Sequence, residues 1–421
     1  MGSSGVQRPL KFVKYLHQFG WQPVVLAPHP GVYHTFDESL NEELTKTETP
    51  IYRVDAKTPF HLAGKSSRQI KYIPNRLKEA ARTISSFFYI PDNKTGWIKP
   101  AISKADEILS DYKIDAVFST SPPPSNHLIA AELSKKHGLP AVMDFRDDWL
   151  EYPLSIYPTR LHRRKNAKLE YQTVRSADGV VANNRSTLDS LKSRIFPDDE
   201  IPSRVITHGF DPDDFPSNTE DSAEKNDKIK FLYSGIFYEQ RKPDRFLEAV
   251  QNLIKKGFLR EDEFEIHFQG GLDDSVIAKI TSMGMKKNLV DYGYVEHRQA
   301  VQNLFKADVL WFIIKHSKQS DTVTPGKLYE YMATRKPILG LIPDGDAKNT
   351  LKEYNAGFSC NPDDAEKIES TLQSIIEKWR NGSLPDPDEK VINRYNRQTL
   401  TGELAGFLDE VAGLEKVKSY K

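Results

Sequence analysis

The stretch DVLWFIIKHSKQSDTVTPGKLYEYMATRKPILGLI, residues 308–342, decides the fold. Its two ends, DVLWFII (308–314) and KPILGLI (336–342), are short runs of branched and aromatic residues, which are typical of buried strands. Between them, Thr324-Pro325-Gly326 is typical of a turn, and a helical pattern begins near Lys327. A strand, a helix and a strand in this order predict a βαβ unit of a parallel sheet.

The same alternation of apolar runs and helical patterns covers the rest of the chain. In the first half the expected strands are residues 23–28, 51–54, 115–120, 140–145, 179–184 and 204–209. In the second half they are residues 230–235, 264–271, 289–295, 308–314, 336–342 and 356–360. Between the halves, the polar segment SNTEDSAEKNDK (217–228) is typical of a linker.

We therefore predict an α/β protein of two doubly wound, Rossmann-like domains that face a cleft. The N-terminal domain is expected over residues 1–216, the linker over 217–228 and the second domain over 229–390. A C-terminal helix within residues 391–421 is expected to pack back on the N-terminal domain. Because ligands of such sheets bind beyond the carboxyl ends of the strands, the cleft is the expected site.

Composition excludes several classes of protein. The 421 residues include 59 basic and 59 acidic side chains, so the formal net charge is zero and a nucleic-acid coat is not expected. The single cysteine, Cys360, cannot form an intramolecular disulfide, and no Cys/His cluster has the spacing of zinc ligands, which favours a cytoplasmic protein. No apolar run reaches about 18 residues, and the first residues lack the apolar core of a signal peptide.

The turn before Lys327 is the strongest candidate for binding chemistry. A helix that starts after Thr324-Pro325-Gly326 presents unpaired N–H groups and the positive end of its dipole, which suit a diphosphate. Lys327 in the first turn opposes that dipole, so a bound anion would explain its charge. Glu330, about one turn further on, can accept hydrogen bonds from ribose hydroxyls. The alternative is an ordinary helix with a solvated Lys and Glu.

Several segments resemble the retaining GT-B glycosyltransferases of the family-4 type. Lys327, Glu330 and the run EYMATRKPIL resemble the nucleotide-sugar-binding helix of that family. Five further segments resemble family motifs and follow the family's order: SGVQRPLKFVKYL (4–16), TSPPPSNH (120–127), DFRDDW (144–149), ITHGFD (206–211) and YSGIFYEQRKPDRFLEAV (233–250). The resemblance covers nearly the whole chain and implies transfer of a sugar from a nucleotide diphosphate.

The resemblance also implies roles for individual residues. Arg241 matches the family's diphosphate-binding lysine, with a surface Arg-Lys pair as the alternative, and it is expected to stabilise the leaving diphosphate together with Lys327. The expected donor-binding residues are Gly5, Gly235, Thr324, Pro325, Gly326 and Glu330.

The chain departs from the family pattern at three places. Ile236 stands where an arginine is common, and Thr322 stands where a second glutamate is common, so the donor sugar stays open. The family's apolar first strand has no counterpart before the Gly-rich segment at Gly5, so we expect an N-terminal sheet without that strand.

The segment DFRDDW (144–149) ends a predicted strand with a cluster of charged residues, at the edge where an α/β sheet meets its ligand. Asp147 is the first candidate for a catalytic acid or base that orients an acceptor hydroxyl. Arg146 is a candidate acceptor contact, with an Arg–Asp ion pair that shapes the loop as the alternative. His127 and Trp97 complete the expected acceptor-binding residues, and a structural histidine and a packed tryptophan are their alternatives.

Two segments concentrate positive charge. Residues 57–104 carry ten Lys and Arg against two acidic residues, and apolar residues from Ile73 to Phe88 recur there at helical spacing. The segment from Arg160 to Arg175 adds six basic residues against one acidic residue. A basic amphipathic helix is typical of membrane-surface binding. The alternative is an apolar stripe that belongs to the core beneath a solvated basic face.

The leading hypothesis is a cytoplasmic, membrane-associated hexosyl- or related glycosyltransferase. It would move a sugar from a nucleotide diphosphate, with retention, to a glycan or lipid-linked acceptor in surface polysaccharide synthesis, and it would need no cofactor and no metal. Its expected partners are the nucleotide sugar, the acceptor and an inner-leaflet membrane surface, and no nucleic acid. A sugar-nucleotide epimerase or hydrolase of the same fold and a degenerate binding subunit are the alternatives. A dehydrogenase is disfavoured because no G-x-G-x-x-G follows a predicted strand.

Overall fold

The structure, a computed structural model, describes residues 4–29, 38–56, 75–152, 155–198, 200–215, 227–237, 242–316 and 323–414. The chain forms two compact units: unit 1 consists of Met1–Thr207 with Gln398–Lys421, and unit 2 of His208–Arg397. The chain therefore enters unit 2 before the predicted linker at 217–228, of which only residues 227 and 228 are described.

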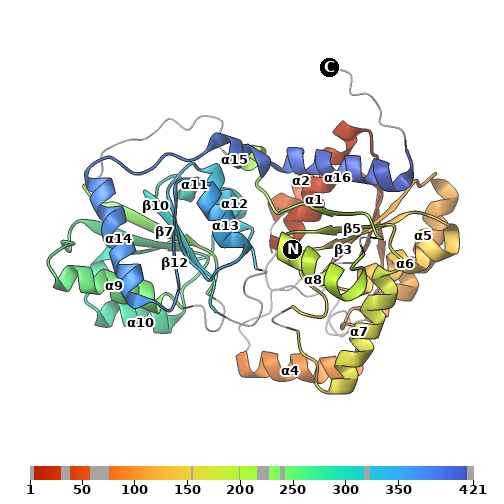
Figure 1. Ribbon diagram of the computed structural model, residues 1–421, viewed down its shortest axis with the longest axis horizontal. Coiled ribbons are helices and arrows are strands. Elements are labelled where there is room, and N and C mark those ends of the chain that lie inside the picture. The colour runs from red at the N-terminus through yellow and green to blue at the C-terminus, as the bar shows by residue number, and fades with distance from the viewer. Residues whose placement is uncertain are drawn as a thin grey trace. The chain divides into compact units, whose positions relative to one another are not determined.

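Unit 2 is built on a six-stranded parallel sheet with the strand order β12-β11-β10-β7-β8-β9 (Figure 1). The strands are β7 (Ile229–Ser234), β8 (Phe264–Gln269), β9 (Leu289–Asp291), β10 (Val309–Ile313), β11 (Ile338–Leu341) and β12 (Gly357–Cys360). Side chains alternate between the two faces, so that Phe231 and Tyr233 join one buried cluster and Leu232 joins the other. Both faces are apolar because helices cover both.

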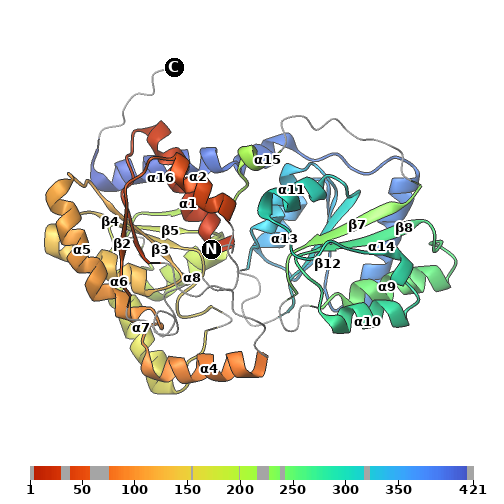
Figure 2. The same ribbon diagram turned by 180° about the vertical axis from the view of Figure 1, so that it is seen from behind.

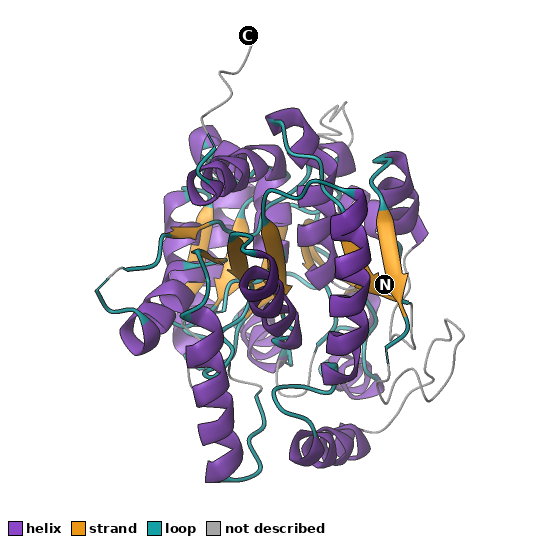
Figure 3. Ribbon diagram, turned by 90° about the vertical axis from the view of Figure 1, so that its right-hand side faces the viewer, coloured by secondary structure: helices purple, strands orange, loops and turns teal. Residues whose placement is uncertain are grey.

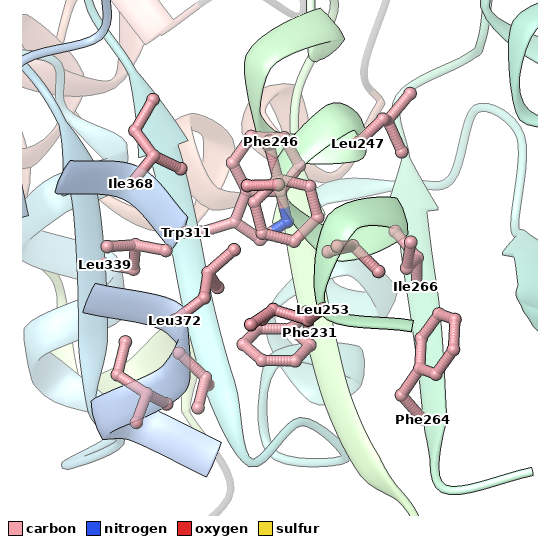
Figure 4. Close-up of a cluster of buried hydrophobic side chains, with 14 of the residues drawn as sticks. Phe231, Phe246, Leu247, Leu253, Phe264, Ile266, Trp311, Leu339, Ile368 and Leu372 are labelled. Atoms are coloured by element: carbon pink, nitrogen blue, oxygen red, sulfur yellow. The ribbon is translucent and has the colours of Figure 1, made fainter. Parts of the chain in front are cut away.

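The helices of unit 2 form a layer on each face of this sheet. On one face lie α9 (Asp244–Lys255), α10 (Asp274–Ser282) and α14 (Ala365–Arg380). On the other lie α11 (His297–Leu304), α12 (Lys327–Ala333), α13 (Asp346–Glu353) and α15 (Glu389–Arg394). The first layer is anchored by Phe246, which stacks on Trp311 with ring centroids 4.2 Å apart (Figure 4). The predicted doubly wound arrangement is therefore confirmed in this unit.

Unit 1 contains two parallel sheets, and no hydrogen-bonded strand joins them among its described residues. The larger sheet has the order β3-β4-β5-β6, with β3 (Val117–Ser121), β4 (Ala141–Phe145), β5 (Gly179–Ala182) and β6 (Ser203–Val205). The smaller sheet pairs β1 (Val25–Pro28) with β2 (Ile51–Val54). Strands β4 and β5 are buried throughout, whereas every residue of β1 is partly exposed. The predicted strands are therefore present, but they divide between two sheets.

Helices also lie on both sides of the strands of unit 1 (Figures 2 and 3). They are α1 (Ser4–Leu16), α2 (Glu38–Lys46), α4 (Asn75–Phe88), α5 (Ile98–Asp111), α6 (Ser125–His137), α7 (Arg160–Val174), α8 (Arg185–Ile195) and α16 (Arg397–Ala412). α1 and α16 pack on the face that carries Val142 and Val181, and α7 and α8 pack on the face that carries Met143 and Val180. No helix of the described residues combines the length and the apolarity that crossing a membrane requires.

The predicted C-terminal helix is two helices, because the backbone between them pairs with Phe210. The Phe210 N–H donates to the carbonyl of Tyr395 at 3.0 Å, and the Arg397 N–H donates to the carbonyl of Phe210 at 2.9 Å. This extended pairing separates α15 from α16. α15 stays in unit 2, while Leu404 and Phe407 of α16 join the same buried cluster of unit 1 as Phe12 of α1.

Candidate active site

The carboxyl ends of β7 and β10 are the expected ligand position in unit 2. The two strands are neighbours, but the chain continues outward from β7 to β8 and β9, and outward from β10 to β11 and β12 on the other side. Ligands of parallel sheets bind at such a switch point. The ladder between β7 and β10 pairs only Val309 with Phe231 and Leu310 with Leu232, so the strands separate toward their carboxyl ends.

Glycines allow close backbone approach at the ends of β7 and β8. Gly235 has a φ of 129° and Gly270 a φ of 115°, which glycine adopts without the steric cost of a side chain. A Cβ on Gly270 would lie 2.7 Å from the backbone of Gly235, and the Gly235 N–H donates to the Gln269 carbonyl at 2.7 Å. Gly235 is a predicted donor contact. Gly270 was missed, although a Gly-Gly pair directly after a strand signals such a turn.

Lys327 places its ammonium group at this glycine turn. Its Nζ lies 4.2 Å from the centroid of the Tyr233 ring, a cation–π contact. A Cβ on Gly235 would lie 2.5 Å from the same Nζ, so a side chain at that position would displace the ammonium. The structure thus brings together two predicted donor residues, Lys327 and Gly235, at the end of β7.

Glu330 is held as a carboxylate one turn further along α12. Its Oε1 accepts a hydrogen bond from Nε2 of His297 at 3.1 Å, and its side chain is 21% exposed. Burial acts to raise the pKa of Glu330. The hydrogen bond from His297 and the charges of His297, Arg397 and Lys327 outweigh burial and lower the pKa below its ordinary value. An ionised carboxylate only accepts hydrogen bonds, which is the property needed to bind ribose hydroxyls. His297 was missed because it is distant in sequence.

The turn Thr324–Gly326 precedes α12 as predicted. Two backbone N–H groups at the start of the helix, however, already donate hydrogen bonds to carbonyls of the turn. The Leu328 N–H donates to the Pro325 carbonyl and the Tyr329 N–H donates to the Gly326 carbonyl, at 3.0 and 3.1 Å. α12 has only seven residues, so its dipole is short. Beside Gly326 the space is open, since no atom lies within 4 Å of an added Cβ.

Thr324 of this turn carries a buried polar atom. Its Oγ1 has no hydrogen-bond partner among the described residues, although the residue is only 6% exposed. Buried hydroxyls usually have a partner, so Thr324 stays a predicted donor contact on this observation.

Tyr331 links α12 to the separated strands β7 and β10. Its hydroxyl accepts a hydrogen bond from the Ser234 N–H at 2.8 Å and donates to the Trp311 carbonyl at 3.3 Å. The hydroxyl therefore satisfies backbone groups of both strands beyond the end of their ladder. Tyr331 was missed, because an aromatic residue next to Glu330 is equally consistent with a side chain that only packs in the core.

A buried amide supports the ends of β7 and β8. The Nε2 of Gln269 donates to Ser234 Oγ and to the Ala300 carbonyl, both at 2.9 Å, and its Oε1 accepts from Asn303 Nδ2 at 3.1 Å. Gln269 is 1% exposed and fully hydrogen-bonded, so it fixes the two strand ends against α11. Sequence reasoning also missed Gln269.

In unit 1, the end of β4 carries a buried ion pair. Asp144 accepts two hydrogen bonds from Arg8 of α1, at 3.1 Å to Nε and 2.7 Å to Nη2, and a third from Thr120 Oγ1 at 2.7 Å. Arg8 also donates to the Thr207 carbonyl at 2.6 Å, and both ionic side chains are fully buried. Arg8 was missed, although it lies on the same helical stripe as Phe12 and Tyr15, which indicates burial.

Arg146 takes a different partner from the predicted ion pair. Its guanidinium donates to three backbone carbonyls, those of Ser121, Gly5 and Pro122. These bonds join the loop after β4 to the end of β3 and to α1 through carbonyl groups and not through a carboxylate, and an acceptor contact of Arg146 stays a prediction. Gly5 takes part in the same contact, and a Cβ on Gly5 would lie 2.9 Å from Arg146 Nη1.

Asp147, the next residue after Arg146, has a raised pKa. Burial raises the pKa of Asp147 to about 6, while the charge of Arg146 opposes the shift and that of Asp148 adds to it. Among the described residues no hydrogen bond is made to its carboxyl group. A carboxyl group with a pKa near neutrality is suited to general acid or base catalysis.

The next residue, Asp148, anchors the loop. Arg194 donates to both Asp148 oxygens and to Glu170 Oε1, at 3.0 to 3.1 Å, and Leu150 N–H donates to the same Glu170 oxygen at 3.1 Å. Burial raises the pKa of Glu170 to about 7, although Arg194 favours its ionised form. This network fixes the loop that carries Asp147.

Trp97 and His127 are both buried in unit 1, and their roles in acceptor binding stay predictions. Trp97 is 7% exposed and joins a cluster with Ala101, Ala105 and Ile129. His127 is fully buried, hydrogen-bonds Ser119 Oγ through Nδ1 at 2.8 Å and lies 4.4 Å from the Phe145 ring. Burial lowers the pKa of His127 to about 3, so it stays neutral.

Arg241 and Thr322 lie outside the described residues. Ile236 is 39% exposed directly after Gly235. Within the described ranges, no three His, Cys, Asp or Glu side chains cluster as metal ligands do, and the absence of a metal requirement stays a prediction.

Comparison with known proteins places these features in a family. Residues 10–214 match the profile of Glycosyltransferase Family 4, and residues 214–398 match that of Glycosyl transferases group 1. A search of curated proteins gave no match.

Solved structures share the fold at low sequence identity. A glycosyltransferase from Rickettsia africae is 14% identical, with a TM-score of 0.65 over 97% of this chain and 95% of the other. HepE from Anabaena in complex with UDP is 12% identical, with a TM-score of 0.64 over 97% and 96%. A putative UDP-N-acetylglucosamine 2-epimerase from Listeria monocytogenes is 13% identical, with a TM-score of 0.56 over 100% and 97%.

Each unit is thus a Rossmann-like α/β unit of the GT-B type, and the family profiles cover nearly the whole chain. The chain belongs to glycosyltransferase family 4, in the group 1 class of nucleotide-sugar glycosyltransferases.

Proposed function

We propose that the protein transfers a sugar with retention from a nucleotide diphosphate to a glycan or lipid-linked acceptor, in surface polysaccharide synthesis. The observation that carries the proposal is the cluster at the end of β7, where Lys327 lies over Gly235 and Glu330 is kept ionised by His297. A cation suits the diphosphate and a carboxylate suits the ribose hydroxyls, so the cluster has the chemistry of a nucleotide-sugar site.

The reaction needs stabilisation of the charge that develops on the leaving diphosphate. In the proposal, Lys327 supplies one positive charge and Arg241 a second one, which replaces the family's lysine. Preorganised cations of this kind often contribute the largest part of a rate enhancement. In unit 1, Asp147 is proposed to hydrogen-bond the acceptor hydroxyl, because its pKa of about 6 lets it accept a proton near neutral pH.

A screen of nucleotide sugars tests the donor class. Thermal unfolding is measured with UDP-, GDP-, ADP- and dTDP-sugars, and UDP-sugars are tried first because HepE of similar fold was solved with UDP. We expect one nucleotide to raise the melting temperature by several degrees, since a ligand bound to the native state stabilises it. No shift with any of them would contradict the proposal and favour a degenerate binding subunit.

A sugar-nucleotide epimerase is the second candidate, because the putative epimerase from Listeria shares the fold over the full chain. The two functions differ in their need for an acceptor. Incubation with the donor alone, followed by analysis of the products, separates them: an epimerase converts the sugar nucleotide, whereas the proposed transferase leaves it largely intact. Conversion to the epimer without an acceptor would contradict glycosyl transfer.

A further inference from the structure

His297 and Glu330 connect two helices that lie on the same face of the sheet of unit 2. His297 is the first residue of α11, and Glu330 lies in the first turn of α12. Nε2 of His297 donates to Oε1 of Glu330 at 3.1 Å, and the two side chains are 16% and 21% exposed. The contact therefore joins elements that are separated by 33 positions in the chain.

Among the described residues, this contact uses one oxygen of the Glu330 carboxylate. The other oxygen, Oε2, accepts no hydrogen bond from the described part of the chain, and the side chain is partly exposed, so a ligand can reach it. Because a carboxylate is planar and rigid, a hydrogen bond to Oε1 restricts the directions in which Oε2 can point. His297 therefore orients the acceptor atom that is left for the ribose.

The end of β8 holds α11, and with it His297, in place. Nε2 of Gln269, the last residue of β8, donates at 2.9 Å to the carbonyl of Ala300, the fourth residue of α11. Before the helix, the Gly293 carbonyl accepts a hydrogen bond from the Gly270 N–H at 2.8 Å. The connection between β9 and α11 is thus bonded to β8 on both sides of His297. Groups held in this way position a binding site precisely.

We propose that His297 is a positioning residue that makes the donor site selective for ribonucleotides. It holds Glu330 so that Oε2, with its two lone pairs, accepts hydrogen bonds from the 2′- and 3′-hydroxyls of the ribose. A 2′-deoxyribonucleotide lacks one of these donors and binds more weakly. This role rests on the proposed function, because it takes Glu330 as the group that binds the ribose.

The same hydrogen bond keeps Glu330 ionised. Burial acts to raise the pKa of Glu330, and the hydrogen bond from His297 is the largest of the opposing effects. The charges of Lys327 on the same helix and of Arg397, the first residue of α16, add to the charge of His297. Without His297 the pKa of Glu330 is expected to rise, so that the carboxylate takes up a proton at a higher pH.

Calorimetric titration of the full chain with UDP, GDP and ADP, and with their 2′-deoxy counterparts, tests this role. We expect the wild type to bind one ribonucleoside diphosphate at least about tenfold more tightly than its 2′-deoxy counterpart, because a hydrogen bond to a charged acceptor is lost. His297→Leu removes the N–H donor, and its preference for ribose is expected to fall below about threefold. His297→Gln retains an N–H donor and is expected to recover most of the preference.

A second His–Glu pair in the same unit provides a matched control. Nε2 of His267 lies 2.9 Å from Oε2 of Glu265, and His267 is 6% exposed. Glu265 lies near the amino end of β8, whereas the candidate donor site lies at the carboxyl ends of the strands. His267→Leu is therefore expected to destabilise unit 2 and to leave the preference for ribose at the wild-type value.

The pH dependence of the preference is a second readout, which a purely structural role of His297 would not change. The ratio of the two dissociation constants removes the titration of the phosphates, because both ligands share it. In the wild type the ratio is expected to fall only below the ordinary pKa of a glutamate. In His297→Leu, the remaining preference is expected to disappear at a higher pH, because the pKa of Glu330 rises.

Two results overturn the proposal. They are equal binding of ribose and 2′-deoxyribose ligands by the wild type, and a wild-type preference in His297→Leu, which would make the pair only a contact between α11 and α12. If His297→Leu does not fold, His297→Asn replaces it, since its shorter amide does not reach Oε1. Absence of binding by any of the three ribonucleoside diphosphates would contradict the donor site itself, whereas binding without a preference contradicts the role of His297 alone.

Discussion

Glu330 of unit 2 and Asp147 of unit 1 respond to burial in opposite ways. In unit 2, the pKa of Glu330 lies below its ordinary value, because His297, Arg397 and Lys327 outweigh the effect of burial. In unit 1, burial dominates: it raises the pKa of Asp147 to about 6 and lowers that of His127 to about 3. Charged neighbours therefore decide the ionisation of Glu330, whereas burial decides that of Asp147 and His127, even though unit 1 also holds the buried ion pair of Arg8 and Asp144.

This difference corresponds to different chemistry. A nucleotide diphosphate carries fixed charges, so its site benefits from groups that stay ionised at all working pH values. A sugar hydroxyl must lose a proton during transfer, so its site benefits from a group that titrates near neutrality. The comparison therefore supports the proposal that unit 2 binds the donor and unit 1 carries the acceptor chemistry.

The largest expected effect concerns the buried pair of unit 1. Arg8→Met leaves Asp144 buried without its partner, so we expect a loss of about 3–5 kcal/mol in the unfolding free energy of unit 1. Arg335→Met in unit 2 removes an exposed pair with Glu389 and is expected to cost less than about 1 kcal/mol. Hydrogen exchange in urea, resolved to each unit, measures both. Equal costs would show that burial of the pair does not matter.

The next effect concerns Asp147. A pKa raised from 3.8 to about 6 means that the folded state binds the proton more tightly than the unfolded state, so stability falls as pH rises from about 4 to 6 and is then constant. Asp147→Asn removes this cost, and we expect it to stabilise the protein by up to about 2–3 kcal/mol near pH 7 and by little near pH 4. Thermal unfolding at both pH values checks this. A stability change that is the same at both would contradict the raised pKa.

The activity of the wild type provides a second readout for Asp147. If its carboxylate accepts the acceptor proton, kcat/KM rises with pH through about 6, and Asp147→Asn loses both the rate and this rise. A variant that keeps the wild-type rate would exclude Asp147 from the chemistry.

A smaller effect is expected for Tyr331→Phe. The change leaves the Ser234 N–H and the Trp311 carbonyl without their buried partner, so we expect a cost of about 1–3 kcal/mol in unit 2. Because the separated strand ends then lose their link to α12, the KM for the donor is expected to rise more than kcat falls. Tyr354→Phe in the same unit is the control, since its hydroxyl bonds carbonyls remote from the glycine turn. A donor KM that stays at the wild-type value would restrict Tyr331 to stability.

The smallest effect on stability is expected for Gly326→Ala. Gly326 has a helical φ of −55° and open space around an added Cβ, so the change is expected to alter stability by less than about 1 kcal/mol. If the diphosphate approaches this backbone, donor affinity falls all the same. Gly406→Ala on α16, where the space is also open, is the control that leaves affinity unchanged. Wild-type donor affinity in Gly326→Ala would remove the turn from the site.

The sequence predicts what local patterns encode and misses what distant contacts create. Apolar runs locate the strands of unit 2 to within a few residues: β10, for example, is Val309–Ile313 where 308–314 was expected. Lys327 and Glu330 could be singled out from the sequence, because the motif that resembles the family and the predicted helix start lie next to each other in the chain. Arg8, His297 and Tyr331 were missed because their partners are brought together only by the fold. Arg8 and Asp144, for example, are separated by 136 positions.

Residue type alone does not decide between a buried and a functional role. Trp97 and His127 are apolar or neutral enough to complete the core, and Arg146 has enough donors to bind three backbone carbonyls, two at the end of β3 and one on α1. Only the packing around each side chain makes this choice.

The most direct test of the account is calorimetric titration of the nucleotide sugar selected by the screen into the wild type, Lys327→Ala and Glu330→Ala. The account predicts that the wild type binds and that each variant binds at least about tenfold more weakly, a loss of about 1.4 kcal/mol or more. The control Lys367→Ala, an exposed lysine of α14, is predicted to bind as the wild type does. Equal dissociation constants in the wild type and both site variants would contradict the assignment of the donor site to the end of β7.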